Sequence, residues 1–110
     1  MPIEITRFDS EHAVSWDDGG ASGVSRVPLS ETRGVRVATL YFEAKGEIGR
    51  REVPYPVLLI ILEGSGTLRL GGEIREITAG DAIPLPANSM HMIWTTGTPM
   101  TALLVEYPEE

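Results

Sequence analysis

The chain has 110 residues, the size of a single domain. Nine Lys and Arg residues stand against 16 Asp and Glu residues, giving a formal net charge of −7. An acidic field repels nucleic-acid phosphates and anionic membranes, and a chain without cysteine has no disulfide and no thiolate metal ligand.

The amino-terminal half shows short alternating segments separated by polar, glycine-rich stretches. Residues 3–8 and 35–42 alternate in the way that predicts strands, whereas residues 12–23 read as a loop and residues 44–49 as a turn. The run Asp17-Asp18-Gly19-Gly20 lacks the further spaced oxygens of a calcium loop, so we interpret it as a solvated turn. The first ten residues lack the basic and apolar blocks of a signal peptide.

The carboxy-terminal half is denser in predicted strands. Residues 57–62 are apolar on both faces, so this strand must be covered on both sides, and the run is too short to cross a bilayer. Gly71-Gly72 predicts a two-residue hairpin turn. Further strands are expected at residues 68–70, 73–77, 90–95 and 101–107, with an edge or bulged strand at 82–85 and turns at 79–81 and 96–99.

These elements predict an all-β chain with no helix longer than about two turns. We expect one domain over residues 1–110, with an amino-terminal strand and loop extension at 1–33 and a barrel core at 34–107. A cytoplasmic protein without nucleic-acid or membrane partners is expected.

Gly80, Pro86 and His91 stand at the spacings of the second motif of the cupin superfamily, G-x5-P-x-G-x2-H-x3-N. Asn88 replaces a glycine of that motif, and Thr95 replaces its asparagine. Since Asn tolerates positive φ, the first change is mild. The chain therefore resembles the cupins, and the resemblance implies a cupin-type antiparallel jelly-roll β-barrel of about six to eleven strands.

The first cupin motif, G-x5-H-x-H-x3,4-E-x6-G, is matched only at Gly64, its final glycine. Counting back, Val57 stands at the glutamate position, and Arg51 and Val53 stand at the two histidine positions. A longer spacer places Arg50 and Glu52 there instead. The resemblance thus leaves His91 as the one remaining residue of the four that usually bind the family's metal.

The chain has two histidines, so it cannot supply a three-histidine site, and catalytic metals usually take three or more protein ligands. We expect no tightly bound cofactor. The alternative is a divalent transition metal on His91 with Glu47 or Glu52, or with His12 folding over the barrel mouth.

Strand parity predicts which side chains face the barrel interior. Val57 and Leu59 face inward in one strand, as do His91 and Ile93 in another. This largely apolar lining is typical of a small-molecule pocket with His91 as its main polar anchor, and equally of a filled core. A ligand acid group could be held by Arg51; alternatively, Arg51 is a solvated loop charge paired with a nearby glutamate.

Three functional hypotheses follow. The first is a metal-free cupin that binds a small molecule through His91, Arg51 and Tyr41 and the apolar lining. The second is a metal-dependent cupin enzyme, a dioxygenase or isomerase, with a non-standard site. The third is a metal-free isomerase that uses His91 and Tyr41 as acid and base, with Tyr55 as another tyrosine near the mouth.

Outward-facing apolar residues need cover as well. Leu58 and Ile60 point away from the interior of their strand, as do Met92 and Trp94 of theirs. A symmetric homodimer is the simplest cover, and the alternative is the amino-terminal segment.

Overall fold

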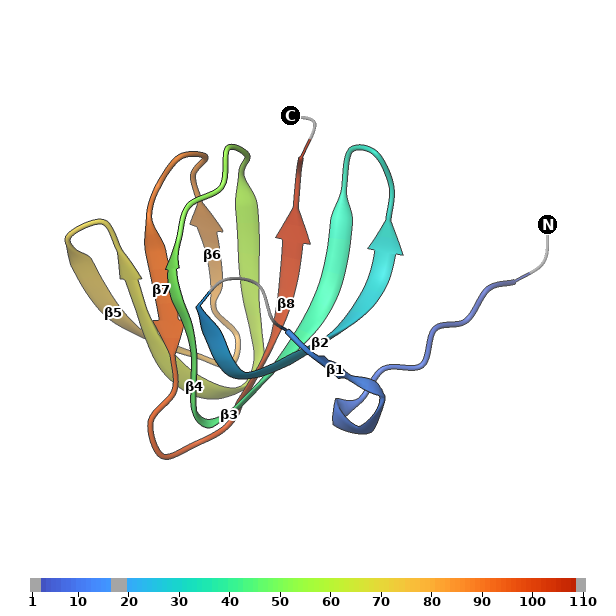
Figure 1. Ribbon diagram of the computed structural model, residues 1–110, viewed down its shortest axis with the longest axis horizontal. Coiled ribbons are helices and arrows are strands. Elements are labelled where there is room, and N and C mark those ends of the chain that lie inside the picture. Colours follow the sequence, from blue (N-terminus) through green and yellow to red (C-terminus); the bar gives the residue numbers. More distant parts are fainter. Residues whose placement is uncertain (1–2, 17–19, 109–110) are drawn as a thin grey trace.

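Eight β-strands and one short 3-10 helix form a jelly-roll barrel in the computed structural model, which describes residues 3–16 and 20–108 (Figure 1). The all-β prediction is confirmed. Within the described residues, no helix is both long enough and apolar enough to cross a membrane. The elements are η1 (Ser10–His12), β1 (Val14–Ser15), β2 (Ala21–Glu31), β3 (Arg36–Arg51), β4 (Val57–Leu70), β5 (Glu73–Thr78), β6 (Ala82–Leu85), β7 (His91–Trp94) and β8 (Met100–Glu106).

The two long strands, β3 and β4, each change partner along their length. The first half of β3 pairs with β8 and its second half pairs with β7. The first half of β4 pairs with β8 and β6, and its second half pairs with β7 and β5. The circuit β3–β8–β4–β7 therefore returns to its first strand and closes the barrel.

Glycine permits the bend of β4. Gly64 has φ 77°, and a Cβ at this position would overlap the carbonyl oxygen of Pro99. Only glycine fits a backbone approach this close at a positive φ. The final glycine of the first cupin motif is thus a structural corner of the barrel.

The barrel interior is filled by one side of each strand. Its fully buried residues include Leu40 and Phe42 of β3, Leu59 and Ile61 of β4, and Ile93 of β7. The inward parity predicted for β4 and β7 is confirmed by these positions.

The predicted turns of the carboxy-terminal half are also confirmed. Leu70 pairs with Glu73 across a two-residue turn in which Gly71 has φ 60°. Asn88 has φ 60°, as expected where the motif usually has glycine. The edge strand β6 pairs with β4, and no other strand of the described residues pairs with it.

Three predictions for the amino-terminal half are wrong. Residues 3–8 form no strand; they run away from the barrel, with Ile3 88% exposed, because no sheet edge lies beside them (Figure 1). Residues 44–49 are not a turn but part of β3, where Gly46 lets the backbone of Gly23 in β2 approach closely and Gly49 does the same for Gly20 just before β2.

The predicted loop at 12–23 is the third, because it contains β1 and the start of β2. Strand β2 pairs with β3 along most of its length, so the expected extension contributes a full strand. Asp17, Asp18 and Gly19 of the predicted solvated turn lie outside the described residues.

Candidate functional site

His91 and Arg51 lie side by side on neighbouring strands at one end of the barrel. Arg51 is the last residue of β3 and the register partner of His91, the first residue of β7. His91 is buried and shares the inward parity of Ile93. A register shift between Ile48 and Arg51 ends regular pairing at this point, as bulges at barrel rims do.

A buried carboxylate lies at the same end. Glu106, the last residue of β8, is the register partner of both Arg36 in β3 and Val57 in β4. Its neighbours of the same parity, Leu104 and Ala102, belong to the core, so the Glu106 side chain also points inward. The alternation of β8 thus places a charge inside the barrel.

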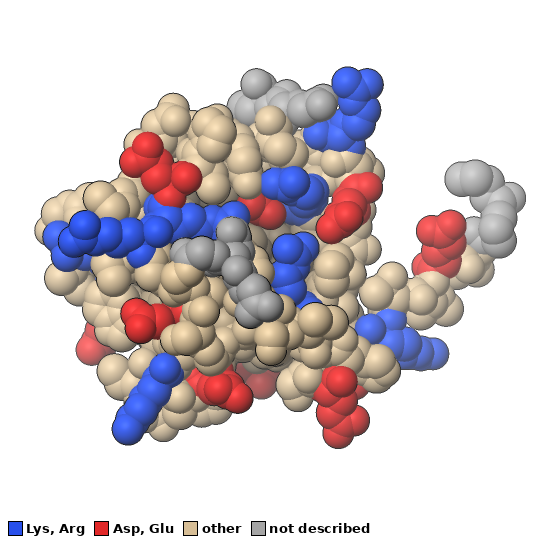
Figure 2. Space-filling view, viewed as in Figure 1, with Lys and Arg blue, Asp and Glu red and all other residues tan. Residues whose placement is uncertain are grey.

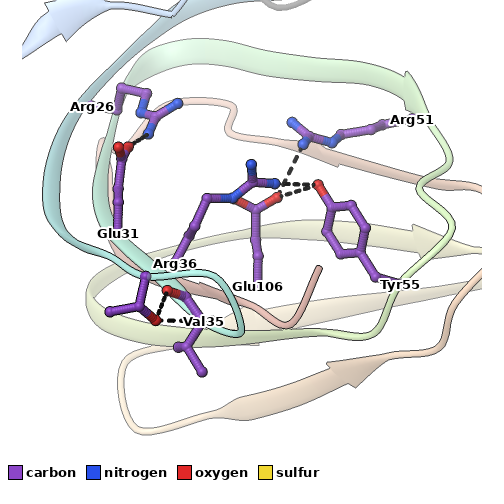
Figure 3. A network of polar contacts seen from close by, with 8 residues as sticks. Arg26, Glu31, Val35, Arg36, Arg51, Tyr55 and Glu106 are labelled. Carbon is purple, nitrogen blue, oxygen red and sulfur yellow. Dashed lines mark hydrogen bonds and ion pairs between the residues drawn. The ribbon is translucent and has the colours of Figure 1, made fainter. Parts of the chain in front are cut away.

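Three side chains converge on the Glu106 carboxylate (Figure 3). The Tyr55 hydroxyl donates to Oε2 at 2.8 Å, and Arg51 Nη2 donates to the same oxygen at 3.3 Å. Arg36 Nε lies 3.7 Å from Oε1, and Arg36 Nη2 donates to the Tyr55 hydroxyl at 2.9 Å. We name Arg36, Arg51, Tyr55 and Glu106 the mouth cluster.

Trp16 lies beside the mouth cluster. The Arg51 guanidinium is 4.8 Å from the Trp16 ring centroid, and the Arg26 guanidinium is 5.9 Å from it. Both distances allow cation–π attraction. Arg26 also forms an ion pair with Glu31 at 3.7 Å. The buried indole therefore has two cations within cation–π distance.

Charged side chains of both signs meet at the mouth cluster. Two guanidinium groups contact the Glu106 carboxylate, in a chain whose net charge is −7. Basic side chains gather across the middle of the face in Figure 2, with acidic side chains set around and between them.

Two titratable groups at the mouth are held in neutral form. Burial lowers the pKa of His91; the Ser89 backbone opposes this effect, and the Arg51 charge adds to it. Burial also raises the pKa of Tyr55, as does its hydrogen bond to Glu106. A neutral imidazole is able to donate a hydrogen bond to a ligand oxygen, whereas the single Tyr55 O–H is already donated to Glu106.

An apolar groove of about 450 Å³ opens on the interior side of β4, β5 and β6. Its apolar lining comes from Leu68, Leu70, Ile77 and Ile83, and its rim carries Glu73, Arg75, Glu76 and Asp81. Leu70 is the register partner of His91. The groove therefore extends to the strand pair that carries the mouth residues.

A family model described as the AraC-like ligand binding domain matches residues 38–109, from β3 to beyond β8. The chain belongs to this family. As an AraC-like ligand-binding domain it has a cupin-type barrel, and the resemblance read from the second motif is confirmed. No curated protein sequence matches the chain.

Solved structures show the same fold at low sequence identity. The domain resembles the polyketide cyclase RemF from Streptomyces resistomycificus, with a TM-score of 0.84 and 20% identity over 96% of this chain and 81% of that one. A predicted oxalate decarboxylase from Thermotoga maritima gives 0.79 and 22% over 93% and 98%. An RmlC-like cupin from Shewanella frigidimarina gives 0.78 and 19% over 97% and 94%.

The residues of the domain do not fit the metal that cupins commonly hold. Arg51 lies at one ligand position of the first cupin motif, where its guanidinium carries a positive charge, and Val57 lies at another. Within residues 3–16 and 20–108, no three His, Asp or Glu side chains gather as a metal site would require. Glu47 and Glu52 are exposed, and Glu47 pairs with Trp94 on the outward parity of β7.

The structure does not bring every predicted site residue together. Val57, Leu59 and Ile93 are packed in the core cluster. Tyr41 pairs with Thr101 on the outward parity of β3, opposite to the buried Leu40 and Phe42. Burial raises the pKa of Tyr41, as do nearby Asp9 and Glu63.

Sequence reasoning missed Arg36, Glu106 and Trp16. Arg36 has the parity of Leu40, and Glu106 has that of Leu104, so alternation alone carried the signal that both charges point inward. Arg51 donates a hydrogen bond to Glu106, fifty-five positions away.

Proposed function

We propose that the domain binds an organic small molecule at the barrel mouth and does so without a transition metal. The observation that carries the proposal is the position of Arg51. It stands beside His91, where cupins place a metal ligand, and its charge is anchored by Glu106. A guanidinium at this point opposes a metal cation but binds ligand oxygens through directed N–H groups.

The local geometry supports a preformed site. Tyr55 and Glu106 hold Arg51 and Arg36 in place through hydrogen bonds and ion pairs, so less side-chain freedom is lost when a ligand binds. His91 adds a buried ring whose Nδ1 has no hydrogen-bond partner of good geometry among the described residues. A ligand oxygen would satisfy such a group.

The third hypothesis, acid–base isomerisation by His91 and Tyr41, has no support from the geometry. Tyr41 lies on the outward parity of its strand, whereas His91 faces the interior. We therefore assign binding, and not this chemistry, to the mouth.

Two measurements test the proposal. Elemental analysis of tag-free protein should give less than about 0.1 transition metal per chain, because one imidazole holds a divalent ion weakly. Amide NMR spectra recorded with a library of small organic fragments should show shifts around Arg51, Tyr55, His91 and Glu106. Near-stoichiometric metal that disappears in His91→Ala would instead support the metal-dependent hypothesis.

We also propose a homodimer formed through the outer face of β3, β8 and β4. Ile60 of β4 and Leu103 of β8 are aligned in one row by the strand registers, beside Thr39 of β3, which the chain already buries. Leu58, Val105 and Val37 form the next row. Two such rows of largely apolar side chains favour cover by a second subunit.

Met92 and Trp94 lie on a different face from these rows. They line a hollow with Lys45 and Glu47, beside the second half of β3. The four interface candidates from the sequence therefore divide into two pairs, and the more continuous apolar surface lies with Leu58 and Ile60.

A further inference from the structure

A small hollow of about 100 Å³ lies on the outer side of the sheet, where β3, β7 and β4 are neighbours. Arg69 alternates with the buried Leu68 in β4, so its side chain points away from the barrel interior. Its register partner is Met92, which alternates with the buried Ile93 in the same way. The residues that line the hollow are Arg50, Arg69, Gly71, Met90, His91 and Met92. No member of the mouth cluster lines it, so the hollow is separate from the barrel mouth.

Arg50 and Arg69 reach this hollow from the two strands that flank β7. Arg50 stands in the register shift near the end of β3, and Arg69 stands near the end of β4. Because β7 lies between β3 and β4, the two backbones are about two strand spacings, or about 10 Å, apart. Both long side chains nevertheless line the same hollow, so its contents lie between two guanidinium groups.

The charges of these two arginines are not neutralised by the described residues. Within residues 3–16 and 20–108, neither Arg50 nor Arg69 forms an ion pair. Arg69 Nε donates to the Gly71 carbonyl oxygen at 3.2 Å, and its terminal nitrogens have no hydrogen-bond partner in the described ranges. The described lining residues include no carboxylate. Two cations that border one hollow repel each other, and an anion between them replaces this repulsion by attraction.

The size and the position of the hollow select the kind of anion. Pockets for drug-sized molecules measure about 300–1,000 Å³, whereas this hollow has about three times the volume of one water in the liquid, enough for a compact group. A tetrahedral oxyanion directs oxygens to several sides, so guanidinium groups on opposite sides both find acceptors. A planar carboxylate presents its oxygens along one edge, which matches a single fork. A phosphate monoester carries about −1.5 to −2 charges at pH 7, close to the charge of two guanidinium groups.

We infer that the hollow binds a phosphate group, held between Arg50 and Arg69. The hydrogen bond to Gly71 orients the Arg69 fork in advance, which reduces the side-chain freedom lost on binding. Met90 is 45% exposed beside the hollow and offers apolar contact to an organic substituent on the phosphate. The site goes beyond the proposed function, because it lies on the outer side of β7 and uses no residue of the mouth cluster.

Amide NMR titrations at pH 7.5 and constant ionic strength test the inference, with inorganic phosphate, phenyl phosphate, acetate and chloride as probes. Both phosphates should give saturable shifts at the amides of Gly71 and Met92, whereas chloride should give none. Acetate should bind about tenfold more weakly than inorganic phosphate, because it loses charge-assisted hydrogen bonds to one of the two arginines. Tighter binding of phenyl phosphate than of inorganic phosphate would identify an organic phosphate as the ligand, and equal binding would identify free phosphate.

Matched variants locate the phosphate. Arg50→Gln and Arg69→Gln should each weaken phosphate binding about 10- to 100-fold, because each removes charged donors. The control is Arg75→Gln, which removes the same charge from β5. Arg75 is 75% exposed, pairs with Glu73 and does not line the hollow, so its loss should change phosphate affinity less than about twofold.

Arg50 and Arg69 are exposed, so their glutamine variants should fold like the parent protein, which thermal denaturation checks. If one of them does not fold, the lysine variant at the same position provides the readout. Lysine keeps the charge but loses the planar fork, so it should weaken phosphate binding by a smaller factor than glutamine and still by more than Arg75→Gln does.

Three results would overturn the inference. Phosphate shifts equal to those of chloride at the same ionic strength would leave only screening of surface charge. Unchanged phosphate affinity in both Arg50→Gln and Arg69→Gln would place the anion elsewhere, and an equal loss in Arg75→Gln would reduce the effect to net charge. Acetate binding as tightly as phosphate would exclude selection of a tetrahedral anion. None of these results affects the proposed function, whose test reports on the mouth cluster.

Discussion

Replacing Glu106 with Gln tests whether the mouth cluster is a connected unit. Gln keeps the shape of the side chain and still accepts the Tyr55 hydrogen bond, but it removes the charge that faces Arg36 and Arg51. Breaking a buried ion pair on one side costs about 3–5 kcal/mol. Arg36 is 40% exposed, so water screens part of this loss, and we expect a decrease of about 2–3 kcal/mol in the free energy of unfolding.

For a chain of this size, such a loss lowers the midpoint of thermal unfolding by about 8–12 °C. Urea denaturation followed by circular dichroism measures the free energy directly, with an unchanged slope as the sign that only stability has changed. Glu73→Gln is the matched control, because Glu73 pairs with Arg75 at 2.9 Å but both side chains are exposed. The control should change stability by less than about 0.5 kcal/mol. Similar values for the two variants would refute the idea that burial gives the Glu106 pair its strength.

Three further outcomes are expected. Gly64→Ala should lower the free energy of unfolding by more than about 2 kcal/mol in urea denaturation, because the new Cβ meets the backbone of β8 and of the residue before it. The control Gly72→Ala, with open space around the residue, should lower it by less than about 1 kcal/mol. Equal losses would contradict the role of Gly64 as a corner. Burial lowers the pKa of His91 below 6.5, so its NMR titration midpoint should lie below pH 6.5, and a midpoint above 6.5 would exclude this account. The protein should lose stability as the pH falls from about 6.5 toward that midpoint, and His91→Gln should lessen this loss. In analytical ultracentrifugation, Ile60→Lys should give monomers and Trp94→Lys should not; a monomeric parent protein would disprove the dimer.

The sequence predicted the carboxy-terminal half well because its turns are encoded locally. Gly71 and Asn88 adopt the positive φ that their turns require, and these signals do not depend on distant contacts. The predicted turn at 44–49 was wrong for the opposite reason. Gly46 and Gly49 permit two strands to approach, and which strand approaches is fixed by residues more than twenty positions away.

The candidate site was predictable only in part. The second motif identified His91 through local spacing. Arg51 became a candidate because it stands where the first motif has a histidine. The partners of Arg51 come from elsewhere in the chain: Glu106 lies on the last strand, and Trp16 precedes β2. Alternation predicts that a side chain points inward, but it does not say which inward charges meet.

The exchange of partners by β3 and β4 also governs how the barrel is assembled. Strand β8 pairs with the first halves of both strands, although residues 36–42 and 100–106 lie far apart in the chain. Neither strand has its full set of backbone hydrogen bonds until β8 is inserted. Closure must therefore wait for the most distant contacts, and such non-local topologies fold on the order of milliseconds to seconds. During synthesis, the half-formed barrel would expose the apolar faces of β3 and β4 until residues 100–106 emerge, so this interval is when the chain is most vulnerable to aggregation.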